Sequence, residues 1–532
     1  MRINFFSFLR LLKVRKIALP QILKEFNQVF VDAGYKAYLV GGAVRDVILG
    51  SKINDYDVAT NATPQDVMKL FKFVVPTGFE HGTVTVHFKN EEIEVTTFRT
   101  ETGYSDGRHP DSVNYAATIE EDLSRRDFTM NAIAVDLNDE KIVDPYGGQD
   151  DIAKKLIKTV GNPHERFMED GLRPIRALRF ASKLNFSIEK YTYLEIFKED
   201  IQKKITSISI ERFRDEFNKI LVSKKPSVGL KLMEETGVLK LFIPELAQAR
   251  GVIQGDFRGF HEFDVLDHLF YACDGAPQNK LNVRIAALFH DIGKPAVKKV
   301  LVENDVETFT FYNHENVGEK IARKIFVRLK YSNAEIENFC HLIKNHMFHY
   351  ESNWTNAAIR RFIVRVQKEN FEDLFDLRLA DVYGMHNKDV RKHDTLTCQN
   401  LLELKDRIDE ELKNQNALSL KDLAINGNDI ISLGGSGKQI GIILNQLFDC
   451  VLEDPEMNTK EKLLEVSRLI LNSEGWIKNF LAKTLIITKF LVNLPLINLH
   501  FNRIYKFELL HKSFANEINE SIRKIELRYL GK

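Results

Sequence analysis

The fold is decided by the stretch Leu39–Val40–Gly41–Gly42–Ala43–Val44–Arg45–Asp46, which is followed by Asp55–Tyr56–Asp57. The apolar residues predict a strand that runs into two glycines and then into a helix carrying Arg45. Glycines let backbone N–H groups approach a phosphate closely, and the N-terminus of a helix adds partial positive charge. The spacing differs from the Gly-x-Gly-x-x-Gly fingerprint of dinucleotide-binding folds. The stretch therefore predicts a phosphate-binding turn of another kind.

Two carboxylates follow that turn. Asp55 and Asp57 are two residues apart, so on a strand they share one face. A third acid, Glu94, lies in the predicted strand Ile93–Phe98. Carboxylates that converge beside a phosphate-binding turn suit Mg²⁺ held between protein and triphosphate. Each motif alone is typical of an ordinary turn or solvated loop, whereas their order along the chain favours nucleotidyl transfer, with Asp55, Asp57 and Glu94 as the catalytic acids.

The pattern of apolar and turn residues changes along the chain, from strand-like to helical, and predicts an α+β protein. Gly and Asp separate short β-like runs in the first third, as turn signals should. The predicted strands are Ala37–Val40, Phe73–Val75, Thr83–Phe88, Ile93–Phe98 and Ala132–Leu137. We expect a basic N-terminal extension and helix (1–35), an α/β domain (36–160), a helical domain (161–250), a histidine-rich domain (255–385), a second helical domain (400–472) and a C-terminal extension (473–532).

Arginines downstream of the carboxylates are candidates for holding a nucleotide. Arg125 and Arg126 are adjacent, and Asp127 is expected to orient one of them through a bidentate pair. Further along, Asp170 and Arg173 are expected to be neighbours at i and i+3 of one helix. Pro174 counts against a regular helix interior there, because proline usually starts or kinks a helix.

Seven of the 15 histidines fall in residues 255–385. The hexad His290–Asp291–Ile292–Gly293–Lys294–Pro295 resembles HD-domain phosphohydrolases, which use the order His, His-Asp, Asp. The expected ligands of a two-metal site are His268, His290, Asp291, His314, His346 and Asp381. Imidazole and carboxylate ligands suit Mn, Fe, Ni, Zn or Mg, and such a site suits hydrolysis of a phosphoester. The alternative is a degenerate HD fold kept for RNA binding or packing; His261, His341 and His349 are taken as structural.

Composition bears on possible partners, on the compartment and on membrane insertion. In 532 residues, 75 Lys+Arg balance 75 Asp+Glu, so any nucleic-acid surface must be local. Four scattered cysteines form no disulfide framework, which fits a reducing, cytoplasmic compartment. The most apolar run, Phe480–Ile497, is interrupted by polar residues, so no membrane span is expected.

Several motifs together resemble the bacterial CCA-adding enzymes, the class II tRNA nucleotidyltransferases, which are related to bacterial poly(A) polymerases. The motifs are GGAVRD, DYD, EVTTFRTE, YSDGRHP, RRDFTMNA, DPYGGQDD, ERFMEDGLRPIRALRF and, less densely, LAINGNDI with GKQIGIILNQL. The resemblance implies a polymerase-β-like nucleotidyltransferase head, a mixed sheet with helices. It also implies a mainly helical neck, a body and a tail, and here the HD domain lies in the body.

The resemblance also implies residue roles. Asp55 and Asp57 match the Mg²⁺ ligands, and Asp170 with Arg173 match the pair that reads the base. The remaining matches are the nucleotide contacts Gly42, Arg45, Arg126, Arg176 and Arg179. The implied substrates are ATP and CTP, and the implied partner is tRNA.

The loop Glu101–Tyr115 favours full CCA addition, or at least A addition, over CC-only addition. Its residues include Tyr104, Asp106, Arg108, His109 and Pro110. A poly(A) polymerase remains the alternative enzyme, and an RNA-binding HD phosphohydrolase with an inactive head remains the alternative of another class.

Overall fold

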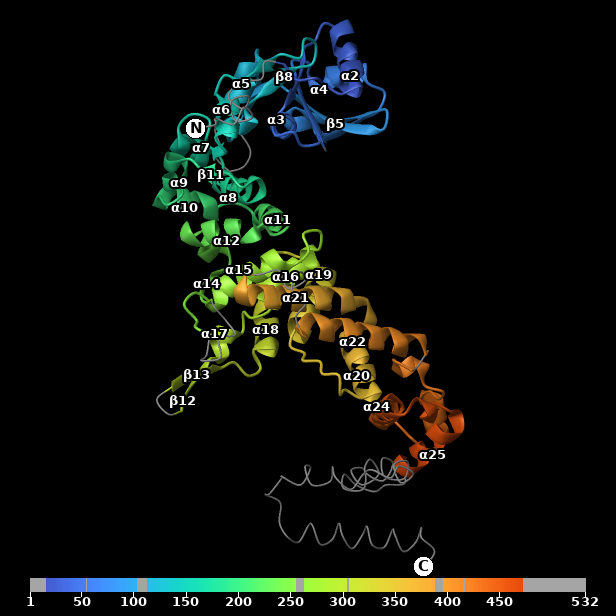
Figure 1. Ribbon diagram of the computed structural model, residues 1–532. Coiled ribbons are helices and arrows are strands. Elements are labelled where there is room, and N and C mark those ends of the chain that lie inside the picture. The colour runs from blue at the N-terminus through green and yellow to red at the C-terminus, as the bar shows by residue number, and fades with distance from the viewer. Residues whose placement is uncertain are drawn as a thin grey trace, which may run out of the picture. The chain divides into compact units, whose positions relative to one another are not determined.

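The computed structural model describes residues 16–53, 55–102, 112–254, 263–303, 306–387, 396–414 and 417–471. These residues form two compact units, shown in Figure 1. The first comprises the described residues up to Ser352 together with Val366–Lys405, and the second comprises Asn353–Arg365 with the described residues from Asp406. The central part of the loop expected at Glu101–Tyr115, His261, the run Phe480–Ile497 and the two terminal extensions lie outside the described residues, apart from residues 16–35. No helix in the described ranges is long and apolar enough to cross a membrane.

A seven-stranded sheet forms the N-terminal part of the first unit, in the order β3-β4-β5-β2-β1-β8-β9. Strands β2 and β5 pair in parallel, and every other neighbouring pair is antiparallel. The strands are β1 (Ala37–Val40), β2 (Tyr56–Thr60), β3 (Val74–Gly78), β4 (Thr83–Phe88), β5 (Glu91–Thr97), β8 (Ala134–Asp136) and β9 (Ile142–Val143). A mixed sheet followed by helices confirms the predicted α+β fold.

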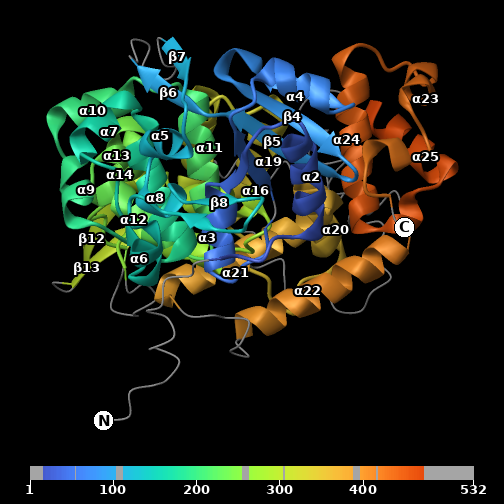
Figure 2. The same cartoon turned by 90° about the horizontal axis from the view of Figure 1, so that it is seen from above.

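Aromatic packing fixes the first helix on this sheet. Phe26 and Phe30 of α2 (Gln21–Asp32) are buried, and both rings contact Phe71. Phe26 also meets Phe88 of β4 edge to face. Figure 2 shows α2 beside β4 and β5. Burying such rings contributes about 1.5–3 kcal/mol each, so the apolar stripe of α2 anchors this edge of the sheet.

Short elements complete this part of the chain. They are α3 (Gly42–Ile48), α4 (Pro64–Leu70), β6 (Arg99–Thr102), β7 (Ser112–Tyr115), α5 (Ile119–Ser124), α6 (Gly148–Ala153), β10 (Leu156–Ile157) and β11 (Ser187–Ile188), with 3-10 turns η1 (Phe79–His81) and η2 (Thr129–Asn131).

The helix expected to carry both Asp170 and Arg173 is broken, which corrects the prediction. Helix α7 (Pro163–Glu169) ends before Asp170, and α8 (Leu172–Leu184) begins after Gly171. A Cβ at Gly171 would lie 2.3 Å from the carbonyl oxygen of Lys204, so only glycine allows this approach. Pro174 falls in the first turn of α8, where its missing N–H costs little. The following helices are α9 (Lys190–Glu195), α10 (Glu199–Thr206), α11 (Ile210–Leu221), α12 (Pro226–Glu235), α13 (Val238–Phe242) and α14 (Pro244–Ala247).

Helices that carry the histidines make up the rest of the first unit, and Figure 1 shows α15 packed along α21. The elements are α15 (Val265–Gly275), α16 (Leu281–Phe289), α17 (Lys294–Val297), β12 (Lys299–Glu303), β13 (Val306–Thr310), α18 (His314–Arg328), α19 (Asn333–Asn345), η3 (Lys368–Asn370) and α21 (Phe371–His386). Strands β12 and β13 form a separate two-stranded hairpin between α17 and α18.

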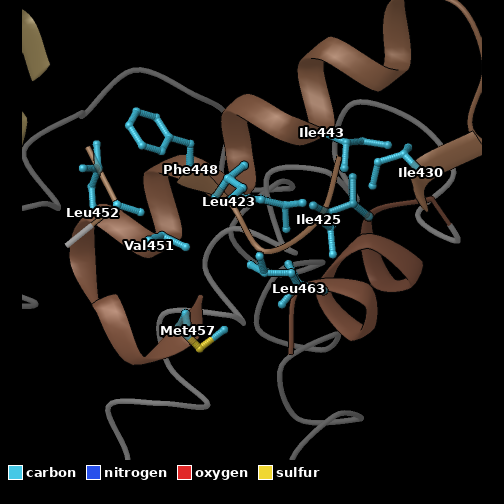
Figure 3. Packing of buried hydrophobic residues seen from close by; sticks show 13 residues of the cluster. Leu423, Ile425, Ile430, Ile443, Phe448, Val451, Leu452, Met457 and Leu463 are labelled. Carbon is cyan, nitrogen blue, oxygen red and sulfur yellow. The ribbon is translucent and has the colours of Figure 1, made fainter. Parts of the chain in front are cut away.

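The second unit has a core of its own, shown in Figure 3, where Ile430, Ile443, Phe448 and Leu463 pack together. Its helical elements are α20 (Asn356–Val366), the C-terminal part of α22 (Leu396–Lys413), η5 (Leu420–Asp422), α23 (Gly427–Ser432), α24 (Lys438–Glu453), η6 (Pro455–Met457) and α25 (Lys460–Leu471). The interruption of the first unit by residues 353–365 means that α20 belongs mostly to this second core.

Candidate functional site

Three carboxylates meet at one place on the sheet. Asp57 of β2 lies directly opposite Glu94 of β5 in the parallel register, and Asp55 immediately precedes β2. Burial, helped by the charges of Glu94 and Asp55, raises the pKa of Asp57 to about 6, against the opposing effect of Arg126. Burial, which is the largest cause, and the neighbouring negative charges both disfavour the ionised carboxylate, and a bound divalent cation would stabilise it. The donor set therefore fits Mg²⁺, which prefers oxygen ligands.

The turn before α3 brings backbone against these side chains. Gly41 has φ of +69°, which favours glycine. A Cβ at Gly41 would lie 3.0 Å from an Nη of Arg126 and 3.7 Å from a carboxylate oxygen of Asp57. The sequence singled out Gly42 as the phosphate contact; the structure shows that Gly41 makes the tight turn possible.

A cavity of about 580 Å³ opens beside this turn. Its walls include every residue predicted to bind the nucleotide or its Mg²⁺ ions except the third acid, Glu94; they are Gly42, Arg45, Asp55, Asp57, Arg126, Asp170, Arg173, Arg176 and Arg179. Small-molecule sites typically have volumes of about 300–1,000 Å³. Residues that are far apart in sequence thus line one space of the size that a nucleotide needs.

Asp122, which the sequence reasoning missed, orients the two adjacent arginines. Its buried carboxylate accepts from Arg125 at 2.8 Å and from Arg126 at 3.1 Å. The expectation that Asp127 would do this is wrong, because α5 places Asp122 one helical turn before both arginines. Asp127 pairs instead with Arg176 at 2.7 Å. Burial opposes ionisation of Asp127, but Arg176 outweighs it and holds the pKa at about 2.

Arg45 and Arg179 are fixed by packing as well as by charge. Arg45 is buried and donates to the side-chain oxygen of Asn131 at 2.7 Å and to Asp46 at 2.7 Å. Arg179 lies over the ring of Phe180, 3.9 Å from its centroid, and pairs with Glu216 at 2.6 Å. Burial lowers the pKa of Arg179 to about 10. Both guanidiniums thus keep defined positions in the cavity wall.

Asp170 is held by an arginine that the sequence reasoning did not select. The Nη atoms of Arg212 in α11 donate to its two carboxylate oxygens at 3.1 and 2.7 Å. The backbone N–H of Leu172 also donates to Asp170, at 2.9 Å. Arg212 lies in the predicted helical domain (161–250), and no motif in the sequence around it points to a role in the site.

Arg173 is held equally firmly. It donates to the backbone carbonyls of Arg166 and Arg125 at 3.0 and 3.1 Å, and it contacts the carboxylate of Glu169. Lys183 and Lys219 also line the cavity and were not predicted. Burial, with Arg45 and Arg179, lowers the pKa of Lys183.

The six predicted HD residues converge in a second, buried cluster. His268, His290 and Asp381 form one group of possible ligands, and His290, Asp291 and His346 form another. His314 joins the second group, with Nε2 3.1 Å from Asp291. One carboxylate oxygen of Asp291 approaches His268 and His290, and the other approaches His314 and His346. Asp291 can therefore bridge two ions.

The backbone sets the tautomers of three of these histidines. The Nδ1 atoms of His290, His314 and His346 each lie 2.7–2.9 Å from the carbonyl oxygen three residues earlier, which makes Nδ1 the donor. Their Nε2 atoms therefore face the cluster, and two Nε2 pairs approach to 3.1 and 3.3 Å. Burial opposes a charge on His290, but Asp291 and Asp381 raise its pKa to about 10. The cluster thus attracts positive charge, which a divalent metal supplies with ligands already oriented.

Two cations and one glycine complete this cluster. Lys294 and Arg378 each lie 2.5 Å from a carboxylate, Asp291 and Asp381 respectively. A Cβ at Gly293 would lie 2.1 Å from the carbonyl oxygen of His314. Gly293 therefore lets the start of α18, which carries His314, approach the His290–Asp291 pair.

Known proteins resemble the chain along much of its length. The family profile of the poly A polymerase head domain matches residues 37–158, that of the probable RNA and SrmB-binding site of polymerase A matches 185–250, and that of the HD domain matches 258–385.

Curated relatives and a solved structure agree with these profiles. The CCA-adding enzyme of Lactobacillus johnsonii is 46% identical over 221 residues, which are 42% of this chain and 54% of that relative. The crystal structure of the Bacillus stearothermophilus CCA-adding enzyme in complex with CTP is 26% identical, with a TM-score of 0.62, and covers 84% of this chain and 97% of its own.

The matched part of the chain spans 54% of the length of the Lactobacillus johnsonii enzyme and 59% of that of a Limosilactobacillus reuteri CCA-adding enzyme. The match to the CCA-adding enzyme of Enterococcus faecalis is longer, at 36% identity over 334 residues, which are 63% of this chain and 71% of that relative. These matches agree with the mixed sheet and with the cavity beside Asp55 and Asp57, and they show that the chain belongs to the family of CCA-adding enzymes.

Proposed function

We propose that this protein adds C, C and A to the 3′ end of tRNA, using CTP and ATP and no nucleic-acid template. The observation that carries the proposal is the position of Asp170 and Arg173 in the same cavity as Asp55 and Asp57. A pair suited to reading a base therefore shares one space with carboxylates suited to holding the metal of a triphosphate.

The chemistry of the base edge explains the choice of nucleotides. Cytosine and adenine each present an amino donor beside a ring-nitrogen acceptor, whereas uracil and guanine present the reverse. A carboxylate has about four acceptor positions, and the contacts of Asp170 with Arg212 and Leu172 take three of them. Asp170 thus keeps capacity for the amino group, while Arg173 donates to the ring nitrogen.

A second group of residues in the cavity wall is suited to binding the phosphates. Gly42, Arg45 and Arg126 form a positive surface for the triphosphate, with Arg126 oriented by Asp122. Asp55, Asp57 and Glu94 would hold Mg²⁺, which when bound supplies charge neutralisation at the reacting phosphate. Arg176 and Arg179 extend the positive wall toward the nucleotide, and their pairing with Asp127 and Glu216 keeps them in place.

Purified protein incubated with tRNA that lacks CCA and with each labelled NTP tests the proposal. CCA addition gives products up to three nucleotides longer, dependent on CTP and then ATP. Long A tails would identify a poly(A) polymerase instead, and labelling with UTP or GTP as efficient as with CTP and ATP would contradict the assignment of the base readers.

We further propose that the HD cluster holds two divalent metal ions and hydrolyses a phosphoester. The observation that favours it is the orientation of four imidazoles with Nε2 atoms toward Asp291 and Asp381. His268, His290, Asp291, His314, His346 and Asp381 would be the ligands, and Lys294 offers a cation beside them. When bound, such ions supply charge stabilisation for the phosphate and activate water.

Metal analysis and assays with p-nitrophenyl phosphate and bis(p-nitrophenyl) phosphate, each with Mn, Fe, Ni, Zn or Mg, test the HD proposal. Two bound ions per chain and hydrolysis of one substrate support it, and a protein that binds no metal contradicts it. We also propose the functional division into head (36–160), neck (161–250), HD body (255–385) and tail (400–472), which truncation at these boundaries tests.

A further inference from the structure

Asn131 lies between two charged residues of the nucleotide cavity and contacts both. Its side chain is buried, and it lines the cavity together with Arg45 and Asp127. The side-chain oxygen accepts from Nη1 of Arg45 at 2.7 Å, and the side-chain nitrogen donates to a carboxylate oxygen of Asp127 at 3.0 Å. Asn131 belongs to the motif RRDFTMNA, but the sequence did not predict it as a site residue.

An amide is the side chain that suits this position. A guanidinium only donates hydrogen bonds and an ionised carboxylate only accepts them, so a group between them must accept on one side and donate on the other. An aspartate at 131 would face the negative charge of Asp127, and a leucine of similar shape would form neither bond. Because the amide is neutral, it fixes Arg45 without adding negative charge to a surface suited to phosphate.

The backbone that carries Asn131 is fixed independently of Arg45. Asn131 ends the turn η2, and Thr129 of the same turn donates to Asp151 of α6 at 2.6 Å. A Cβ at Gly148, the first residue of α6, would lie 2.1 Å from the carbonyl oxygen of Thr129, so only glycine allows this approach. The motif DPYGGQDD, which contains the start of α6, therefore holds the turn that presents Asn131.

Loss of the Asn131 amide would affect Arg45 more than Asp127. Asp127 would keep Arg176, whose Nε donates to its other carboxylate oxygen at 2.8 Å. Arg45 would keep Asp46, which accepts from Nε and Nη2, but Nη1 would lose its acceptor. Because Arg45 is buried, a donor left without an acceptor there is costly. The guanidinium of Arg45 is therefore the group whose position depends on Asn131.

We propose that Asn131 is a positioning residue for nucleotide binding, because it fixes the guanidinium of Arg45 where it meets the triphosphate. The inference rests on the proposed function, in which Arg45 belongs to the surface that holds the phosphates. Each polar atom of the Asn131 amide already has a protein partner, so its effect passes through Arg45 and not through contact with the nucleotide.

Equilibrium dialysis of the full chain with labelled CTP and Mg²⁺, without tRNA, tests the proposal. Asn131→Leu should weaken CTP binding about tenfold, which is the size of one hydrogen bond to a charged group. Thr129→Val removes the bond to Asp151 in the same turn and is the matched control, which should keep the wild-type affinity. Equal weakening by both variants would mean that the turn and not Arg45 carries the effect, and would overturn the proposal.

A double-mutant cycle shows whether Asn131 acts through Arg45. Arg45→Met removes the guanidinium, and replacing both partners of a buried hydrogen bond by apolar groups can be nearly neutral. Asn131→Leu should therefore cause no further loss of CTP affinity in the Arg45→Met background. A further tenfold loss there, or wild-type affinity in Asn131→Leu alone, overturns the proposal.

Extension of tRNA is assayed separately, so that the two proposals can fail independently. A wild type that binds CTP but does not extend tRNA contradicts the proposed function, while the dialysis result still decides the role of Asn131. A wild type that binds no CTP overturns both.

Discussion

Arg212 donates to both carboxylate oxygens of Asp170 across the packing of α11 against α8, at 3.1 and 2.7 Å. A bidentate pair of this kind fixes the plane of the carboxylate as well as its position. The orientation in which Asp170 faces a base is therefore set by a residue of another helix.

Removing this support should relax the choice of nucleotide. Arg212→Gln leaves Asp170 without its bidentate partner, so the ratio of kcat/KM for CTP over UTP should fall about tenfold, within the range of about 1–3 kcal/mol for a good base contact. Steady-state assays on a tRNA ending at the discriminator base measure it. Arg214→Gln, two residues along the same helix, is the control and should keep the wild-type ratio. Equal ratios for both variants would show that Arg212 does not position Asp170.

Exchanging the polarity of the base readers should require a third change. Asp170→Ala or Arg173→Ala should reduce discrimination about tenfold to a hundredfold. Asp170→Arg with Arg173→Asp places a second guanidinium beside Arg212, so we expect this double variant to lose thermal stability. Adding Arg212→Glu should restore stability and move the preference toward UTP and GTP. Assays with all four nucleotides and thermal melts check this, and a stable, active double variant contradicts it.

Ionised Asp57 should destabilise the folded protein, although nucleotide addition requires it. Its pKa of about 6 lies above the ordinary value of 3.8 for an aspartate, so its charge destabilises the folded state, fully so above pH 6. Asp57→Asn should abolish nucleotide addition and raise the free energy of unfolding, without Mg²⁺, by up to about 3 kcal/mol at pH 8. Because wild-type Asp57 is neutral at low pH, the gain should shrink as pH falls through 6 and vanish near pH 4. Urea denaturation across pH measures it; a gain independent of pH would contradict this origin.

The pair of Arg179 and Glu216 should dominate stability near the cavity. Both side chains are buried, so Glu216→Ala leaves an uncompensated guanidinium and should cost about 3–5 kcal/mol. Lys219→Ala removes the more exposed partner of Glu216 and should cost less than about 1 kcal/mol. Urea denaturation compares the two variants, and similar losses would contradict the role given to burial.

Metal binding at the HD cluster should release protons. The pKa of His290 is about 10, so a metal must displace a proton from its imidazole at neutral pH. Affinity should therefore rise with pH up to about 10, and calorimetry in buffers of different ionisation enthalpy measures the proton released. His290→Ala with Asp291→Ala should lose the metal and any phosphoester hydrolysis but keep nucleotide addition. Loss of addition in a folded double variant would show that the two sites are coupled.

Local sequence order predicted the parts of the site that depend on local structure. The strand before Gly41, the helix carrying Arg45 and the strand carrying Glu94 all follow from periodicity and turn residues. The contacts of Arg212 depend instead on how α11 packs against α8, and nothing in the neighbouring sequence of Arg212 specifies that packing.

The corrected expectations have the same origin. Asp127 looked like the partner of Arg125 and Arg126 because it is adjacent to them, but α5 turns Asp122 toward both. Asp170 and Arg173 looked like residues of one helix because they are three residues apart, the spacing of neighbours on a helix face. The close approach of Lys204 to Gly171, a contact between distant segments, accompanies the break.

The six HD ligands make a metal site only if Gly293 is present as well. Since its missing side chain admits the carbonyl oxygen of His314, any larger residue at 293 would push α18 away from His290 and Asp291. A descendant of this chain could therefore lose its HD chemistry through one substitution while all six ligands persist in its sequence. A genome search for the HD ligands alone would then count such inactive proteins as enzymes. The search would have to include position 293 together with the histidines.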